Sequence, residues 1–232
     1  MASETLVLHG PESVQEIVER AAGVLRSGKL VVYPTDTSYG IACDPRLEDA
    51  LMRLIQTKKR NPDMGLPLLF SDLTQCEAYH DFNDMERVLA RLFWPGALTI
   101  VMSTKMPLSS LVTGGRNTVA VRVPDHPIPR GIAKHLEGPI VGTSANISGE
   151  ESPFDVDMAR KQLGDSVDLY IDGGPSLSSS NSTIVGVEPG TPSNITVYRE
   201  GELSVDKLTE RLRMDTDAIR YWSSRVVRAQ VK

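Results

Sequence analysis

Helical and strand-like hydrophobic patterns alternate along most of the chain. In residues 12–27, apolar side chains recur at helical spacing and Gly28 follows, which predicts a helix that ends there. Residues 203–232 are also predicted to be helical, with a break near Met214. Similar stripes predict further helices over 47–58, 84–93, 128–136 and 155–163, and short apolar runs predict strands over 30–35, 66–70, 97–102, 118–123, 140–144, 167–172, 182–187 and 195–200.

This order of elements predicts an α/β protein with a mixed sheet. Helices and strands alternate first, and two strands then follow each other near the end, which is not the pattern of a purely parallel sheet. We therefore expect one domain over residues 1–202 and a short helical C-terminal extension over residues 203–232.

The composition is that of a globular protein with a substantial core. The 232 residues are 40% hydrophobic and 24% charged, and the mean hydropathy is −0.18. No apolar run approaches the ~18–20 residues of a membrane span, and residues 1–30 lack the apolar core of a signal peptide. Cys43 and Cys76 lie far apart without metal-type spacing, which favours a reducing compartment without a structural disulfide or zinc. We expect a cytoplasmic protein without a membrane segment.

The charge is unevenly distributed. The net charge is −5, but residues 203–232 hold seven Lys/Arg and four Asp/Glu, so the rest of the chain carries −8. A net charge of this sign argues against a protein that coats nucleic acid. The basic C-terminal segment is either a solvated helix face, which we favour, or a contact for a phosphate backbone.

The common signatures of nucleotide binding and serine hydrolysis are absent. The sequence contains no GxxxxGK[ST], GxGxxG or GxSxG, and its histidines are not in metal-ligand spacing. Polar side chains gather instead where predicted strands end. PTDTSYG at 34–40 places several hydroxyls and a carboxylate directly after an apolar run. Folding alone does not demand so many small hydrogen-bonding groups, which indicates a binding loop.

Two further clusters contain arginine. If the helix ends near Asn61, Lys58 and Arg60 can converge into an anion clamp for phosphate or carboxylate, and a solvated basic helix end is the equal alternative. Arg122 lies inside an apolar strand, where a buried guanidinium requires either an anionic ligand or a structural ion-pair partner. His126, between Asp125 and Pro127, is expected to be a turn residue.

Hydroxyl-rich segments complete the set of candidates. VGTSANISG at 141–149 combines a strand with a Gly- and Ser-containing loop, whose donors suit phosphate oxygens, although such loops are also common turns. Ser182 and Thr183 begin another predicted strand, directly after the low-complexity segment SLSSSNS at 176–182.

Taken in order, these segments resemble the YrdC-like family of threonylcarbamoyl-AMP synthases. The resemblance covers roughly residues 12–201 and is carried by PTDTSYG at 34–40, Lys58-x-Arg60 followed by Pro67 and Leu68, PGALTIV at 95–101, TVAVRVPDHPI at 118–128, TSANISG at 143–149 and STI at 182–184. It implies a twisted mixed α/β sheet with flanking helices around a large concave cleft with a positive lining.

The resemblance also implies an activity. Members of the family are nucleotidyltransferases that use L-threonine, bicarbonate and ATP to make threonylcarbamoyl-AMP and pyrophosphate. A carbamate forms from threonine and bicarbonate and attacks the α-phosphate of ATP. A partner threonylcarbamoyl transferase complex then modifies the adenosine beside the anticodon of certain tRNAs. Mg²⁺ is expected to accompany the ATP phosphates, and no protein metal site is expected.

The family's functional residues match positions of this sequence. Lys58 and Arg60 match the catalytic clamp on the phosphates, and Thr37 and Tyr39 match residues that shape the pocket. The threonine contacts match Thr35, Pro67, Arg122 and Ser182, and the nucleotide contacts match Lys58, Thr118, Gly142, Ser144, Asn146, Ser152 and Arg199.

Three features depart from the family pattern. The spacing from Arg60 to Pro67 is longer than usual, Asn181 precedes Ser182 where Glu is usual, and the extra C-terminal domain of longer members is not matched, which indicates the single-domain form. Two other functions are alternatives: a paralogue of the same fold without synthase activity, and a protein that binds tRNA or double-stranded RNA in the basic cleft. The overall acidity and the lack of an aromatic-rich basic strip disfavour RNA binding.

Overall fold

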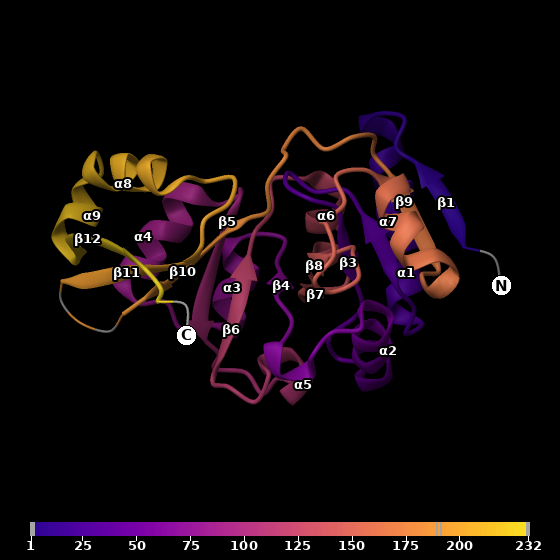
Figure 1. The fold of residues 1–232 in the computed structure, drawn as a ribbon, viewed down its shortest axis with the longest axis horizontal. Coiled ribbons are helices and arrows are strands. Elements are labelled where there is room, and N and C mark those ends of the chain that lie inside the picture. The colour runs from indigo at the N-terminus through magenta and orange to yellow at the C-terminus, as the bar shows by residue number, and fades with distance from the viewer. Residues whose placement is uncertain (1–2, 189, 191, 231–232) are drawn as a thin grey trace.

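The strands of the computed structural model, which describes residues 3–188, 190 and 192–230, form two mixed sheets (Figure 1). The mixed α/β class is confirmed, but the strands are divided between two sheets where the hydrophobic pattern predicts one. The five-stranded sheet has the order β1 (Glu4–Val7), β9 (Leu169–Asp172), β2 (Val31–Tyr33), β3 (Gly40–Ala42) and β8 (Thr143–Ser144). The seven-stranded sheet has the order β12 (Trp222–Arg228), β11 (Ser193–Arg199), β10 (Thr183–Val187), β5 (Leu98–Ser103), β6 (Thr118–Arg122), β4 (Leu68–Leu69) and β7 (Ile140–Val141).

Helices flank both sheets. The helices α1 and α6 pack on each other. α1 also packs on β2 and β9 of the five-stranded sheet and α6 on β4 and β7 of the seven-stranded sheet, and Ile17, Val18, Ile128 and Ile132 are buried in the core that they share. The helices α4, α8 and α9 lie beside the far end of the seven-stranded sheet (Figure 1). The helices are α1 (Val14–Arg26), α2 (Glu48–Lys58), α3 (Leu73–Tyr79), α4 (Asp84–Phe93), α5 (Ser110–Thr113), α6 (Pro127–His135), α7 (Val156–Leu163), α8 (Val205–Arg213) and α9 (Thr216–Tyr221), with 3-10 turns η1 (Pro11–Ser13), η2 (Pro62–Met64) and η3 (Gly164–Ser166).

The chain passes directly from one sheet to the other at Gly142. The sequence pattern predicts a single strand over 140–144, but β7 belongs to the seven-stranded sheet and β8 to the five-stranded sheet. The Gly142 amide donates a hydrogen bond to the Pro67 carbonyl at 2.8 Å. A Cβ at this position would lie 2.2 Å from Leu69 Cγ, so only glycine fits between the two segments. This crossing places Ser144 beside both sheets.

The C-terminal segment is only partly helical, which corrects the prediction of a helical extension over 203–232. The break near Met214 separates α8 from α9, and the chain then forms β12, which pairs in parallel with β11. Trp222 is buried, and the aromatic Trp222 and the β-branched Val226 and Val227 suit an edge strand better than a helix. The segment therefore adds a strand to the sheet of the main domain.

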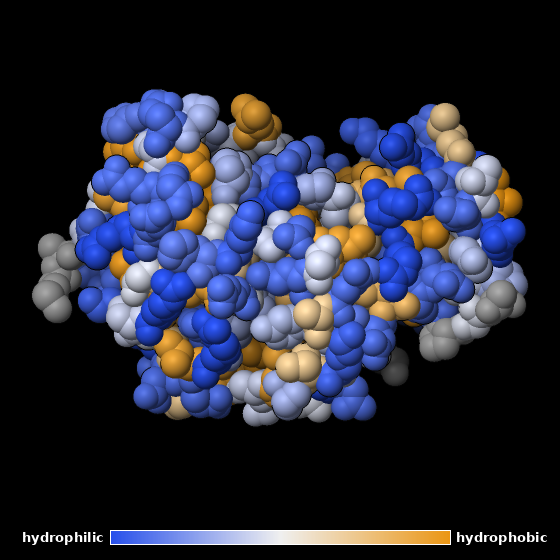
Figure 2. Space-filling view, turned by 180° about the vertical axis from the view of Figure 1, so that it is seen from behind, coloured by the Kyte–Doolittle hydropathy of each residue, from blue (hydrophilic) through white to orange (hydrophobic). Residues whose placement is uncertain are grey.

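The face opposite to that of Figure 1 is mostly hydrophilic, with apolar groups exposed in between (Figure 2). Over the described part of the chain, none of the helices combines the length and the apolar content that crossing a bilayer requires.

Candidate functional site

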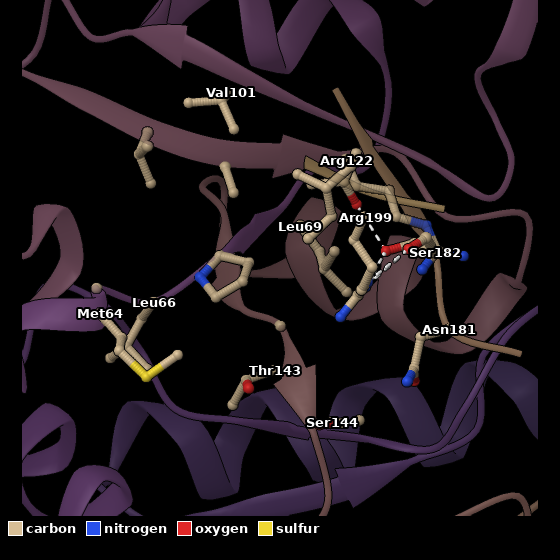
Figure 3. Close-up of a pocket in the computed structure, with 18 of the residues that line it drawn as sticks. Met64, Leu66, Leu69, Val101, Arg122, Thr143, Ser144, Asn181, Ser182 and Arg199 are labelled. Carbon is tan, nitrogen blue, oxygen red and sulfur yellow. Dashed lines mark hydrogen bonds between the residues drawn. The ribbon is translucent and has the colours of Figure 1, made fainter. Parts of the chain in front are cut away.

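A cavity of about 640 Å³ is lined by residues of both sheets and of the loops between them (Figure 3). Thr35, Thr37, Ser38 and Tyr39 come from the loop between β2 and β3, and Ser144 comes from β8. The lining also includes the other predicted residues Arg60, Pro67, Thr118, Arg122, Gly142, Ser182 and Arg199. Segments far apart in the sequence thus meet around one concave site, as the resemblance implies.

The hydroxyl-rich loop after β2 is held by its own side chains. The Thr35 hydroxyl accepts a hydrogen bond from the Thr37 amide at 2.9 Å and donates to the Ser38 carbonyl at 2.7 Å. The Tyr39 hydroxyl accepts from the Gly173 amide at 3.0 Å and donates to the Gly174 carbonyl at 2.6 Å, which fastens the loop to the segment after β9. These bonds give the loop a defined shape at the edge of the cavity.

Arg122 lies on β6 with its side chain on the cavity, and it is paired with an acid of the same loop. Its Nη2 donates to Asp36 Oδ1 at 2.6 Å, its Nη1 donates to Thr37 Oγ1 at 2.9 Å, and its Nε donates to the Gly96 carbonyl at 2.8 Å. The structural ion pair that the sequence left open is therefore present, and Arg122 still lines the cavity beside Arg199 (Figure 3).

The cavity is electropositive. Arg60, Arg116, Arg122 and Arg199 line it, and no aspartate or glutamate is among its lining residues in the described part of the chain. Burial lowers the pKa of Arg60, and burial together with the charge of Arg122 lowers the pKa of Arg199. Arg60 is therefore poorly solvated, and Arg199 is both poorly solvated and repelled by Arg122, so an anion in the cavity stabilises these charges.

Two of the arginines are oriented by backbone carbonyls. Arg60 Nε donates to the Gly65 carbonyl at 3.0 Å, and Arg199 donates through Nε and Nη2 to the Ser182 carbonyl at 3.1 and 2.7 Å. Arg199 Nη2 also donates to the Ser182 hydroxyl at 3.1 Å. The guanidinium groups are thus fixed before any ligand arrives, which lowers the entropic cost of binding an anion.

Lys58 lies behind the cavity lining. The helix α2 ends at Lys58 because Lys59 adopts a left-handed conformation, and Arg60 then enters the lining whereas Lys58 does not. The Lys58 ammonium is 1% exposed and donates to the carbonyls of Ser144 and Asn146, in the latter case at 2.6 Å. Burial, and secondarily the charge of Arg60, lowers the pKa of Lys58 to about 7.

Asn146 and Ser152 also lie outside the lining. The Asn146 Nδ2 donates to the Glu150 carbonyl at 2.7 Å, and its Oδ1 accepts from the Ser144 hydroxyl at 2.5 Å. The Ser152 hydroxyl accepts from Asn181 Nδ2 at 3.0 Å. In this structure both side chains hold the loops that carry the lining residues.

A model of one protein family, Sua5/YciO/YrdC, described as "Telomere recombination", matches residues 23–201. The chain belongs to the Sua5/YciO/YrdC family. A Mycobacterium tuberculosis relative provisionally named threonylcarbamoyl-AMP synthase is 36% identical over 218 residues, which are 94% of this chain and 99% of the relative. The threonylcarbamoyl-AMP synthase of Pyrococcus abyssi is 32% identical over 206 residues, which are 88% of this chain and 60% of the relative.

Solved structures of other Sua5/YciO/YrdC proteins have the same fold. The crystal structure of P. abyssi Sua5 complexed with L-threonine superposes with a TM-score of 0.83 and 29% identity, covering 97% of this chain and 62% of that one. E. coli YciO superposes with a TM-score of 0.77 and 25% identity, covering 86% of this chain and 96% of that one. This chain thus spans a little over three fifths of the Pyrococcus protein.

The structure adds residues to the site of this family member that the sequence did not indicate. Tyr198 and Arg116 line the cavity from β11 and from the segment before β6. Asn181 also lines it, and its Oδ1 accepts from the Ser38 hydroxyl at 2.7 Å. Asp36 pairs with Arg122 from outside the lining. Two of these residues had a signal in the sequence: Asp36, as the acid inside the polar loop 34–40, and Asn181, as the departure from the family pattern before Ser182.

Proposed function

We propose that this protein is a threonylcarbamoyl-AMP synthase, a nucleotidyltransferase that acts on L-threonine, bicarbonate and ATP. The observation that carries the proposal is the meeting of Thr35, Arg60, Arg122 and Ser144 around one cavity with an arginine-rich lining. Both the carboxylate of threonine and the phosphates of ATP are anions that such a lining attracts. Relatives over nearly the whole chain carry the name of this activity.

The residues divide into two groups around the reacting atoms. Arg122, Thr35 and Ser182, with Pro67, take the threonine side, where Arg122 meets the carboxylate. Arg60, Thr118, Ser144 and Arg199, with the backbone at Gly142, take the nucleotide side. This arrangement holds the carbamate of threonine near the α-phosphate, and Arg60 stabilises the charge that develops as pyrophosphate leaves. Orientation of reactants is worth at most about 7–11 kcal/mol, and we assign most of the acceleration to it.

Mg²⁺ enters this proposal with ATP. The described residues contain no cluster of three or more His, Cys, Asp or Glu side chains that would hold a metal ion, and the cavity lining of the described chain has no carboxylate. The hydroxyls and carbonyls of the cavity suit a hydrated Mg²⁺ whose other ligands are phosphate oxygens. When bound, the ion would neutralise phosphate charge.

The proposal extends to the fate of the product. Threonylcarbamoyl-AMP is a mixed carbamic–phosphoric anhydride and therefore reactive, and the downstream partner in this proposal is the transferase complex that modifies tRNA. Direct contact with RNA has less support, because the net charge of the protein is −5 and Arg228 of the C-terminal segment is paired with Glu200.

One incubation series tests the function. The protein is mixed with Mg²⁺, ATP, bicarbonate and each amino acid in turn, and pyrophosphate is measured. Among the amino acids, we expect release only with L-threonine, and only when bicarbonate is also present. Release that does not depend on threonine, or salt-sensitive RNA binding without any release, would support one of the alternative functions.

Gly65 offers a test of how Arg60 is oriented. Gly65 has a φ of 64°, and a Cβ there would lie 2.7 Å from the Val112 carbonyl oxygen. We expect Gly65→Ala to cost about 1–3 kcal/mol of stability and to raise the KM for ATP several-fold, because the carbonyl that holds Arg60 Nε must shift. Thermal melting and steady-state kinetics measure the two effects.

Gly164→Ala is the matched control for this variant. Gly164 has a φ of 51° but open space around its Cβ position, and it lies at the end of α7. We expect it to lose some stability while the KM for ATP stays unchanged. An unchanged KM for ATP in Gly65→Ala would show that Arg60 does not depend on this carbonyl.

A further inference from the structure

Asp36 is the ion-pair partner of Arg122, and it does not line the cavity. It lies in the loop between β2 and β3, its side chain is 17% exposed, and its Oδ1 is 2.6 Å from Arg122 Nη2. Within the part of the chain that the structure describes, Arg122 has no other acidic partner. The two residues come from different sheets, so the pair also joins the loop of the five-stranded sheet to β6 of the other.

The contacts of Arg122 account for only part of its donors. Its Nε is bound by the Gly96 carbonyl, one N–H of Nη1 by Thr37 Oγ1, and one N–H of Nη2 by Asp36. A guanidinium has two N–H groups on each terminal nitrogen, so each of these nitrogens keeps one further donor. Since the side chain lines the cavity, these donors are available to an anionic oxygen such as that of a carboxylate.

The positive charges of the neighbouring arginines oppose the orientation that Arg122 adopts. It lies close enough to Arg199 to lower the pKa of that residue, and Arg60 and Arg116 also line the cavity. Without a bound anion, the guanidinium groups of these arginines repel one another. The carboxylate of Asp36 opposes this repulsion from behind the lining and holds the guanidinium at a fixed angle.

We propose that Asp36 is a positioning residue that sets the orientation in which Arg122 receives the carboxylate of the amino-acid substrate. The inference rests on the proposed function and assigns a role to a residue that does not itself touch the substrate. Arg122 lies between two carboxylates, one from the protein and one from the substrate. Loss of the protein carboxylate therefore weakens recognition of the substrate carboxylate and leaves the rest of substrate recognition in place.

The test compares L-threonine with L-threoninamide, which lacks the carboxylate charge but keeps the amine and the side chain. The value of kcat/KM is measured for both with wild type and with Asp36→Asn, by pyrophosphate release. We expect wild type to favour threonine, and Asp36→Asn to lose about tenfold with threonine and less than about twofold with threoninamide. A purely structural role would lower both values by the same factor.

Two more variants accompany this measurement. Asp168→Asn is the matched control, because Asp168 is also partly buried and paired with an arginine, Arg53, at 2.8 Å, but lies outside the cavity lining. We expect Asp168→Asn to leave kcat/KM unchanged both with threonine and with threoninamide. Asp36→Glu keeps the charge one methylene further out, and we expect a loss of about threefold with threonine only. If Asp36→Asn does not melt cooperatively, the values of kcat/KM of Asp36→Glu with threonine and with threoninamide decide the test.

The possible results separate the two proposals. An active wild type whose Asp36 variants keep the full preference for threonine over threoninamide overturns the role of Asp36 alone. Equal losses with both substrates overturn it as well. A wild type that releases no pyrophosphate with threonine overturns the proposed function and this inference with it.

Discussion

Replacement of Arg122 by alanine is expected to lower threonine-dependent pyrophosphate release by about 10- to 100-fold. The variant loses the guanidinium that we assign to the threonine carboxylate, and a hydrogen bond to a charged group contributes about 1.5–3 kcal/mol, where each 1.4 kcal/mol is a factor of about ten. Isothermal calorimetry with L-threonine measures the binding step directly. An unchanged threonine affinity would remove Arg122 from the substrate contacts.

The same substitution is expected to destabilise the fold. Arg122 and Asp36 have side chains that are 7% and 17% exposed, and removal of one member of a buried pair costs about 3–5 kcal/mol because the other charge stays uncompensated. The double variant Asp36→Asn/Arg122→Met removes both charges, so we expect it to melt at a higher temperature than Arg122→Ala. It should remain as inactive with threonine, which separates the loss of activity from the loss of stability.

Arg116→Ala tests whether threonine is recognised by the net positive charge of the cavity or by Arg122 itself. Arg116 also lines the cavity, but it is exposed and its Nη1 donates to the Asp63 carbonyl. We expect this variant to bind threonine with an affinity within about threefold of wild type, since we place no substrate carboxylate there. A loss as large as that of Arg122→Ala would mean that net positive charge, rather than one oriented guanidinium, recognises threonine.

Replacement of Lys58 by methionine is expected to slow pyrophosphate release by about 100-fold and to change the KM for threonine by less than about threefold. Lys58 donates to the carbonyls of Ser144 and Asn146, so its loss leaves two carbonyls of the nucleotide-side loop without this donor. A displacement of about 1 Å at the reacting atoms is sufficient for a rate loss of this size. Alanine should act in the same direction. Equal effects on kcat and on threonine binding would contradict a role confined to the nucleotide side.

The lowered pKa of Lys58 makes the stability of the fold depend on pH. Burial lowers its pKa from 10.5 to about 7, so between these values the unfolded chain holds a proton that the folded protein has released. Stability therefore rises with pH across this window, by at most about 1.4 kcal/mol per pH unit. Below pH 7 the Lys58 ammonium is charged in the folded protein as well, so its burial lowers the stability by the full amount. The free energy of unfolding of wild type minus that of Lys58→Met should increase from pH 7 to pH 10.

The difference between the two proteins is the quantity to measure. Burial raises the pKa values of Tyr33, Cys43 and Cys76, so these groups lower the stability of wild type at alkaline pH and mask the effect of Lys58. They are the same in both proteins and cancel in the difference. A difference that stays flat between pH 7 and pH 10 would mean that Lys58 keeps its proton, held by its carbonyl acceptors.

The sequence by itself determined the local elements and the candidate residues. Hydrophobic periodicity predicts α1, α2, α4, α6 and α7 and the strands β2, β4, β5, β6, β9, β10 and β11, because the spacing of apolar residues reflects which face of an element is covered. It does not predict the short buried strand β3, which follows the polar loop directly. The polar groups of 34–40 and 141–149 were visible because they interrupt apolar strands. The positive charge of Arg122 inside an apolar strand required an anionic partner or ligand, wherever that anion lay along the chain.

The tertiary structure alone decided how these pieces meet. Strand order is a non-local property, so the sequence did not show that β7 and β8 separate at Gly142 or that β12 pairs with β11. Whether Lys58 faces the cavity depends on a left-handed Lys59, and the sequence left that open. The partner of Arg122 came from a loop between two strands of the other sheet, because ion pairs form between side chains that packing brings together, whatever their separation along the chain.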